Sequence, residues 1–385
     1  MKVIINILVI ILCTKFYGAL PAPINLLTLA VALVYSLNVF KKKALFKKGI
    51  TLLFIGIIIN AISAKYFRDQ DMLQTLSATG NVFYILLYFF FLKIDCSLKD
   101  CEKIILILGY VFCFCYIIQY IVYPFPLFDG ATFSYTEDVR IRLTGQAILF
   151  LSYFYALNKF LIKPNIKYAV LIILSGIVVL LMGFRVMLFL LFILSLFLIY
   201  KINGLTLRSL LYIFLAGICV FILLQIPEFQ DKVLAILERQ EKDNFDNEDY
   251  VRILNINYYL NEHFHSGWEM FFGSGTPNDS SEYGIYMKNI AKNDGYIYED
   301  IGLWGLSWVM GIIPIFAMLL YSIKAIRLKK MIEYKYLSLF FLFLILSSIL
   351  SSEFFRTGNF VIQAFALYII DKHTNEIKNI NGTDN

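Results

Sequence analysis

The chain has 385 residues, of which 59% are hydrophobic and only 16% charged, and its formal net charge is +6. A water-soluble protein of this size would carry about 25% charged residues, so the composition excludes an ordinary soluble enzyme. Apolar runs long enough to cross a bilayer as a helix recur along the chain, and backbone polar groups in lipid must be satisfied within each helix. The sequence therefore predicts an all-α integral membrane protein.

About 12 apolar runs predict a polytopic bundle of transmembrane helices. The first is interpreted as a retained span because no small-residue cleavage site follows it. The predicted organisation is spans 1–9 in residues 1–226, a long loop at 227–299, spans 10–12 in 300–370 and a tail at 371–385. The runs lie at about residues 3–20, 24–40, 49–64, 76–92, 103–123, 143–161, 168–184, 186–200, 209–226, 300–323, 336–352 and 359–370.

Lysine and arginine are unevenly distributed among the short loops, and such loops face the cytoplasm when they are basic. The pattern predicts that both termini are cytoplasmic and that the 227–299 loop is outside the cytoplasmic membrane. The basic residues follow the second, sixth, eighth and tenth spans: Lys41, Lys42, Lys43, Lys47 and Lys48; Lys159, Lys163 and Lys167; Lys201 and Arg208; and Lys324, Arg327, Lys329, Lys330 and Lys335.

The long loop is unusual in length and charge, since residues 227–300 hold fifteen acidic and six basic side chains. Loops of this length are functional or disordered. Apolar residues at helical spacing predict that this one is partly helical and covers the outer mouth of the bundle. The first amphipathic helix contains Phe229, Val233, Ile236 and Leu237, and the second contains Val251, Leu254 and Tyr258.

Arg185 lies between two apolar runs and has no acidic neighbour in the sequence. A charge next to a span is costly and marks a functional path, and the guanidinium group matches phosphate oxygens in bidentate fashion. Arg185 is therefore predicted to bind a phosphorylated substrate and to take part in catalysis. The alternative is a snorkelling side chain or an ion pair with Asp138 or Glu353.

Four other arginines are expected on the same outer face, and with Arg185 they would form a cradle for a diphosphate. Arg140 and Arg142 open the sixth span, where a helix would point them to different faces, so that one would reach inward while the other pairs with Glu137 or Asp138. Simple ion pairs are the alternative for the other two arginines. These pairs would be Arg252 with Glu248 and Arg356 with Glu353.

Other polar residues of the loop give weaker signals. Gly273 and Gly275 flank Ser274 in a turn that either binds substrate or only reverses the chain. His263 and His265 lack further ligands at zinc spacing, so no metal or cofactor is expected, and exposed or helix-capping roles are favoured for them.

Asp294 lies just before the tenth predicted span and either acts as a general base for a sugar hydroxyl or caps a helix. Asp300 follows a few residues later, and for this carboxylate the capping role is favoured.

The order of these motifs resembles the O-antigen and capsule polymerase family, membrane-embedded repeat-unit polymerases related to the O-antigen ligases. The ligase-type members share a histidine late in the long loop, where this chain has Asn293 and Asp294. This departure favours a polymerase. The matching motifs are Arg142-Leu143-Thr144-Gly145, Gly183-Phe184-Arg185, Arg252, Gly273-Ser274-Gly275, Asn293-Asp294-Gly295-Tyr296-Ile297 and Gly302 with Gly305.

The resemblance implies a metal-independent glycosyltransferase of the bacterial cytoplasmic membrane. It would join oligosaccharide repeat units linked to undecaprenyl diphosphate into an O-antigen or capsule polysaccharide. The expected partners are this lipid-linked oligosaccharide, membrane lipids and a chain-length regulator protein, with no nucleic acid. The alternatives are a ligase-type glycan transferase and a transporter or flippase of lipid-linked glycans.

Overall fold

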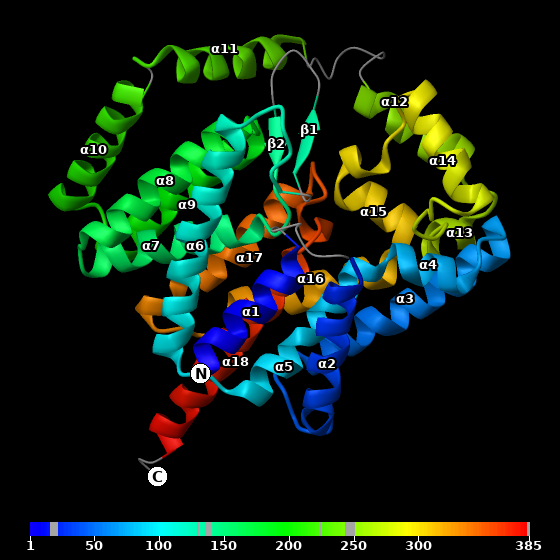
Figure 1. The fold of residues 1–385 in the computed structure, drawn as a ribbon, viewed down its shortest axis with the longest axis horizontal. Helices are drawn as coiled ribbons and strands as arrows, with labels where there is room; N and C mark the ends of the chain where they lie inside the picture. Colours follow the sequence, from blue (N-terminus) through cyan, green and yellow to red (C-terminus); the bar gives the residue numbers. More distant parts are fainter. Residues whose placement is uncertain (16–21, 129–130, 135–139, 224, 243–250, 383–385) are drawn as a thin grey trace.

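The computed structural model describes residues 1–15, 22–128, 131–134, 140–223, 225–242 and 251–382. Helices make up nearly all of the regular structure, so the all-α prediction is confirmed, and the one exception in the described residues is a two-stranded ribbon. Figure 1 shows the arrangement. In chain order the elements are α1 (Lys2–Thr14), α2 (Ala22–Phe40), α3 (Lys47–Arg68), α4 (Met72–Ala78), η1 (Gly80–Leu86), α5 (Leu87–Ile94), α6 (Leu98–Ile121), β1 (Thr132–Ser134), β2 (Arg140–Arg142), α7 (Ala147–Ile162), α8 (Ile166–Met182), α9 (Arg185–Asn203), α10 (Leu207–Leu223), α11 (Pro227–Lys242), α12 (Val251–Tyr258), η2 (Tyr259–His263), α13 (Gly267–Phe272), α14 (Glu282–Asn293), η3 (Tyr298–Ile301), α15 (Leu303–Met310), α16 (Ile312–Arg327), η4 (Ile332–Tyr334), α17 (Lys335–Ser348), η5 (Glu353–Phe355) and α18 (Asn359–Gly382).

Several helices have the length and composition of membrane spans. Within the described residues, four are long and apolar enough to cross a bilayer: Pro23–Phe40 in α2, and α3, α6 and α9. A fifth span results if α4 and the segment Gly80–Ile94 count as one, although the two are bent by 67°. The helices α1, α7 and α8 are apolar but shorter. These helices are typical of a membrane protein, and the number of twelve spans stays a prediction.

The predicted span at residues 300–323 is not continuous, because the chain breaks at Gly302 and again at Gly311. Gly311 has φ +85°, and a Cβ there would lie 2.3 Å from the Phe272 carbonyl oxygen. Gly273, also at φ +85°, faces this break, and its own Cβ would lie 2.3 Å from the Gly311 nitrogen. Only glycine allows two backbones so close at these torsions. Hydropathy alone cannot detect such a break, since the flanking residues are equally apolar.

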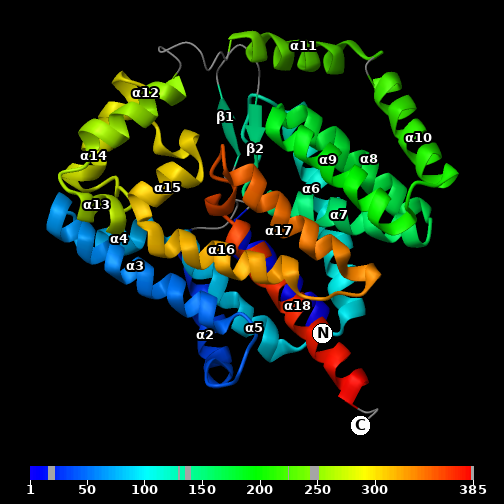
Figure 2. The same ribbon diagram turned by 180° about the vertical axis from the view of Figure 1, so that it is seen from behind.

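The centre of the molecule is α18, whose residues Phe360–Ile370 are at most 1% exposed. A helix that is apolar on every side is stable only when other helices surround it. Figure 2 shows α18 beside α5, and α18 also packs against η1, α1 and α7. Leu27 of α2, Phe189 of α9 and Phe214 of α10 are instead more than 60% exposed. These outer helices present an apolar surface of the kind that faces lipid.

Different segments of the chain lie at the two ends of the helical bundle. Lys2 Nζ donates to the Asp95 carbonyl oxygen at 2.9 Å, and Lys372 pairs with the Asp95 carboxylate at 2.5 Å. Lys324 Nζ donates to the Leu45 carbonyl oxygen at 2.6 Å. The start of α1, the loop at Asp95, the basic loops after α2 and α16 and the later part of α18 are thus joined to one another, and both chain ends lie at the bottom of Figure 1. The side of the membrane that this end faces stays a prediction.

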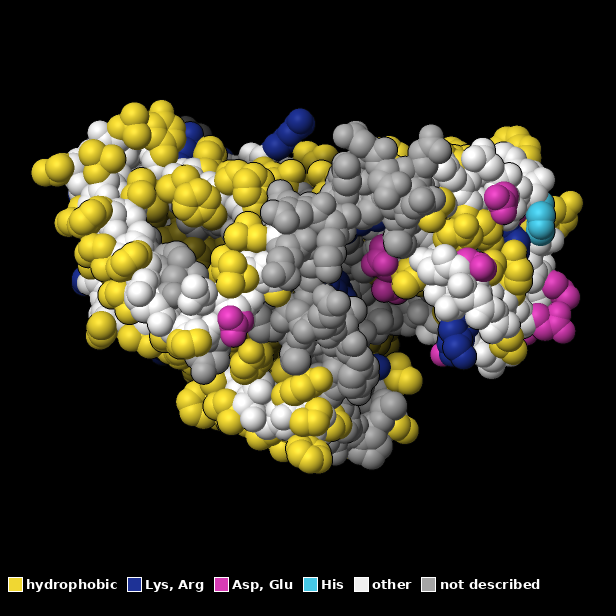
Figure 3. Space-filling view, turned by 90° about the horizontal axis from the view of Figure 1, so that it is seen from above, with side chains coloured by type: hydrophobic (Ala, Val, Ile, Leu, Met, Phe, Trp, Pro, Cys, Tyr) yellow, Lys and Arg dark blue, Asp and Glu magenta, His cyan; other side chains and the backbone are white. Residues whose placement is uncertain are grey.

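The described parts of the 227–299 segment lie at the opposite end and are folded. The predicted amphipathic helices are α11 and α12, while the acidic residues 243–249 lie outside the described part of the chain. Figure 3 looks onto this end and shows acidic side chains over the α13–α14 side and hydrophobic ones over the α10 side. A separate small core joins the segment to α15, and its buried residues are Tyr258, Tyr259, Tyr283, Met287, Ile290, Ile301 and Trp308.

Candidate functional site

One cavity at this end brings together all the arginines that the sequence singles out. Its volume is about 840 Å³, within the range of small-molecule sites. The arginines come from four separate segments: the β-ribbon, the start of α9, α12 and the η5–α18 turn. They are Arg140, Arg142, Arg185, Arg252 and Arg356.

Arg140 and Arg142 lie on strand β2, which pairs antiparallel with β1. Because side chains alternate along a strand, residues two apart share a face. Ile141 between them is fully buried, and the two guanidinium carbons lie 5.7 and 4.2 Å from the centre of the Phe184 ring. The prediction that a helix would separate these two side chains is therefore wrong, since the segment is extended and the helix begins only at Ala147.

Arg185 is the first residue of α9, directly after the tight turn predicted from Gly183-Phe184-Arg185. Gly183 has φ +69° and ends α8 in the left-handed conformation. Phe184 is the N-cap and offers no side-chain oxygen to the first amides of α9. The amino end of a helix carries a partial positive charge and unpaired N–H groups, so α9 adds to the positive field of its arginine.

The remaining two arginines differ in their surroundings. Arg356 pairs with Glu353, which is the ion pair considered as the alternative for this arginine. Glu353 is fully buried and also accepts a hydrogen bond from Gln146 Nε2 at 2.5 Å. Arg252 lies on α12, and the partner considered for it, Glu248, is outside the described residues.

The electrostatics of the cavity reflect partial burial of like charges. Burial, followed by repulsion from Arg356, lowers the pKa of Arg142 to about 10. Burial raises the pKa of Asp300, against the opposing effect of Arg252, Arg142 and Arg356. Among the described residues, the carboxylates that line the cavity beside the five arginines are those of Asp300 and Glu299. The described part of the cavity lining therefore carries an excess of positive charge, in an environment that is poorer in water than the open surface.

One wall of the same cavity is apolar. It is formed by α9 and by the end of α17, and Phe189 and Ile349 in it are exposed on the outside of the bundle. A cavity with clustered guanidinium groups and an apolar side wall suits an amphiphile that has an anionic head and a hydrocarbon tail. The apolar lining residues are Val186, Met187, Phe189, Leu190, Leu346, Ile349 and Leu350.

Three residues of the predicted site lie elsewhere. Gly273 and Gly275 pack on α3, where a Cβ on Gly275 would lie 2.3 Å from the Ala64 Cβ, and their turn pairs with the Trp308–Val309 backbone. Asp294 is exposed at the carboxyl end of α14. None of the three lines the arginine cavity. The glycines have a structural role in this turn, and the assignment of Asp294 as a base stays a prediction.

The sequence did not predict a second polar cluster, which is centred on Arg68. Arg68 at the end of α3 is 8% exposed and pairs with the fully buried Glu269 at 2.5 Å. It also donates to the carbonyl oxygen of His263, whose Nε2 lies 3.0 Å from Ser274 Oγ. His263 is 2% exposed, so the prediction of an exposed or capping role is wrong for it, whereas His265 is exposed. The sequence feature that could have indicated this cluster is the position of Arg68, a basic residue at the end of the apolar run that forms α3.

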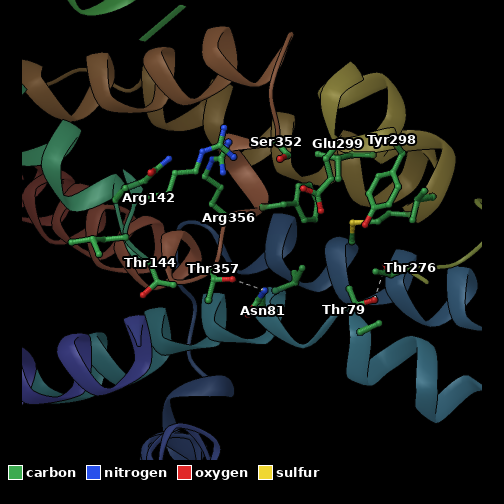
Figure 4. Close-up of a pocket in the computed structure, with 18 residues that line it drawn as sticks. Thr79, Asn81, Arg142, Thr144, Thr276, Tyr298, Glu299, Ser352, Arg356 and Thr357 are labelled. Carbon is green, nitrogen blue, oxygen red and sulfur yellow. Dashed lines mark hydrogen bonds between the residues drawn. The ribbon is translucent and has the colours of Figure 1, made fainter. Parts of the chain in front are cut away.

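A smaller cavity of about 260 Å³ adjoins the arginine cavity, and sequence reasoning did not anticipate it. The two share Arg142, Glu299, Ser352 and Arg356. Figure 4 shows Arg142 and Arg356 on one side of this chamber and Tyr298 and Glu299 on another. The rest of its polar lining is uncharged and comes from five segments of the chain: Thr79 and Asn81, Thr144 and Gln146, Thr276, Tyr298, and Thr357.

Comparison with known proteins adds no assignment. The chain matches no protein-family model, and no curated protein matches it. The function of the site is therefore argued from its geometry and from the resemblance of its motifs.

Proposed function

We propose that the chain is a glycosyltransferase that polymerises oligosaccharide repeat units carried on undecaprenyl diphosphate, on the outer side of the bacterial cytoplasmic membrane. The observation that supports this most strongly is the convergence of five arginines on one cavity with an apolar wall. A lipid diphosphate has both features that the cavity complements, namely a multiply charged head and a long hydrocarbon tail.

In the proposed reaction a hydroxyl of one repeat unit attacks the anomeric carbon of another, and the lipid diphosphate leaves with the bonding electrons. Negative charge then grows on the departing phosphate oxygens. Cations that are already fixed around that position stabilise the transition state without reorganising. Arg185 and Arg142 are assigned this role, with Arg140, Arg252 and Arg356 binding the same head group.

The apolar wall between α9 and α17 is the proposed path for the lipid tail. Phe189 and Ile349 are exposed at the outside of this wall, where hydrocarbon chains would approach it. A tail that stays in the bilayer while its head enters the cavity keeps its apolar surface out of water, which favours binding.

Reconstitution tests this proposal. The purified protein in detergent is mixed with lipid-linked glycan extracted from source cells that lack the gene for this chain. Formation of a ladder of longer glycans on a gel supports a polymerase. A flippase would need closed vesicles and would leave the glycan length unchanged, so the absence of a ladder in detergent contradicts the proposal.

A deletion strain separates the polymerase from a ligase-type transferase. Surface glycan reduced to a single repeat unit indicates that polymerisation was lost. Complete loss of surface glycan, with lipid-linked polymer retained in the membrane, indicates a ligase instead.

A further inference from the structure

The chamber beside the arginine cavity has the chemistry of a site for uncharged hydroxyl groups. Thr79 Oγ1 donates to the Thr75 carbonyl oxygen at 2.8 Å and lies 3.1 Å from Thr276 Oγ1. Asn81 Nδ2 donates to Thr357 Oγ1 at 3.3 Å. Each hydroxyl and amide can both donate and accept, which is the complement that a sugar ring needs. The charged residues are confined to the side shared with the arginine cavity.

Two polar atoms of the chamber lining have no hydrogen-bond partner among the described residues. Gln146 is 1% exposed, and its Nε2 is engaged with Glu353 while its Oε1 is left unpaired. The buried Oγ1 of Thr144 is likewise unpaired. Buried polar atoms are nearly always hydrogen-bonded in folded proteins, and each exception needs an explanation. Hydroxyl groups of a bound ligand would supply the missing partners.

Glu299 stands at the junction of the two cavities. It lines both, whereas its neighbour Tyr298 lines only the chamber and Asp300 lines only the arginine cavity. Figure 4 shows Glu299 across the chamber from Arg142 and Arg356. A carboxylate at this point is beside any hydroxyl that reaches from the chamber toward a head group held by the arginines.

We propose that the chamber binds the accepting sugar and that Glu299 is the general base of the transfer. This inference rests on the proposed function. The Glu299 carboxylate takes the proton of the accepting hydroxyl as its oxygen bonds to the anomeric carbon of the donor. The bond from that carbon to the diphosphate breaks, and the lipid diphosphate leaves with the electron pair beside the arginines.

The test uses the purified full chain in detergent and two measurements, binding of undecaprenyl diphosphate and glycan transfer from the deletion-strain extract. Glu299→Gln keeps the size and hydrogen bonding of the side chain but cannot accept the proton. We expect it to bind the lipid diphosphate as the unaltered protein does and to transfer glycan roughly 10²–10⁴ times more slowly. Glu262→Gln, the same change at an exposed site outside both cavities, is the matched control and should alter neither measurement.

A second variant tests the chamber itself. Thr144→Val removes a hydroxyl that has no hydrogen-bond partner in the described part of the chain, so the variant should fold as well as the unaltered protein. If the chamber holds the accepting sugar, its apparent KM for the lipid-linked glycan rises while binding of undecaprenyl diphosphate stays the same. An unchanged KM contradicts the assignment of the chamber.

The outcomes distinguish this inference from the function on which it rests. If the unaltered protein forms no polymer, the proposed function fails and the inference falls with it. If it polymerises and Glu299→Gln is equally fast, only the assignment of the base is overturned. The same holds if Asp294→Asn, rather than Glu299→Gln, abolishes transfer.

Discussion

Two groups of polar residues at the same end of the molecule, the Arg68 group and the arginine cavity, differ in how the charge of their arginines is compensated. Arg68 pairs with Glu269, donates to the His263 carbonyl oxygen and lies 5.3 Å from the centre of the Tyr283 ring. The arginine cavity gathers five guanidinium groups beside two lining carboxylates, Glu299 and Asp300. Arg68 is compensated within the protein. In the cavity Arg356 is paired with Glu353, and the five arginines still outnumber the carboxylates of the described lining.

Under the proposed function, this difference separates polar groups that stabilise the fold from groups that bind the lipid diphosphate. A buried ion pair whose hydrogen bonds are all made fixes the position of its helices, and its removal leaves an uncompensated charge. A cluster of like charges gains little for the fold and is stabilised by an anion from outside. The comparison makes distinct predictions for variants of the two groups.

The largest effect is expected for Arg68→Ala, which leaves the carboxylate of Glu269 buried and without its partner. Breaking a buried pair in this way costs about 3–5 kcal/mol of folding free energy. The measurement is thermal unfolding of the purified protein in detergent. Arg208→Ala, an exposed arginine at the opposite end, is the control, and equal effects of the two changes would contradict the comparison.

Arg185→Ala should behave in the opposite way, since it removes a binding group and leaves the fold intact. We expect glycan transfer per folded molecule to fall roughly 10²–10³-fold, because one preorganised contact to the leaving diphosphate is lost. Arg185→Lys keeps the charge without the two-pronged geometry and should retain part of the activity. Normal transfer by Arg185→Ala, or loss of the folded protein, would show that this arginine belongs with the structural group.

A smaller loss of folding stability is expected at low pH, because His263, which lies beside Arg68, is buried. Burial, then the nearby charges of Arg68 and His265, lowers the pKa of His263 to about 3 in the folded protein. This pKa is below the usual value of about 6.5. The contribution that the neutral imidazole makes to the free energy of unfolding is therefore fully present above pH 6.5 and is lost as the pH falls toward 3. At pH 5 the loss is about 2 kcal/mol.

The acid effect is measured as the unfolding temperature between pH 7 and pH 5. His263→Gln keeps a hydrogen-bonding group but does not titrate, so its unfolding temperature should change less over this range. An equal acid sensitivity of the variant and the unaltered protein would assign the effect to other groups.

The smallest effect is expected at the opposite end, where Cys96 and Cys101 are fully buried and outside both arginine groups. Cys96 Sγ accepts a hydrogen bond from Asn6 Nδ2 at 2.9 Å, and a serine oxygen can accept the same bond. The double change to serine should leave transfer per folded molecule unchanged, as measured by polymer length and amount. Lost activity in a folded double variant would reveal a coupling between the two ends.

The sequence by itself determined the helical character of the chain and its apolar runs, and it singled out the arginines of the cavity. Apolar runs must form helices in lipid, and a charge beside such a run is costly wherever the run is placed. The choice of Arg140, Arg142, Arg185, Arg252 and Arg356 therefore needed no tertiary contacts. Their convergence on one cavity is a property of the fold that the sequence only suggested.

Only the tertiary structure decided which polar groups are compensated and which are open to a ligand. Arg68 pairs with Glu269, which lies 201 residues further along the chain, and no local sequence pattern indicates such a pair. The hydroxyl groups of the chamber come from segments as distant as Thr79 and Thr357, each an ordinary residue in its own segment. Hydrophobic periodicity indicates which face of a segment contacts lipid or the protein core. The partner of a single polar side chain depends instead on how the whole chain packs.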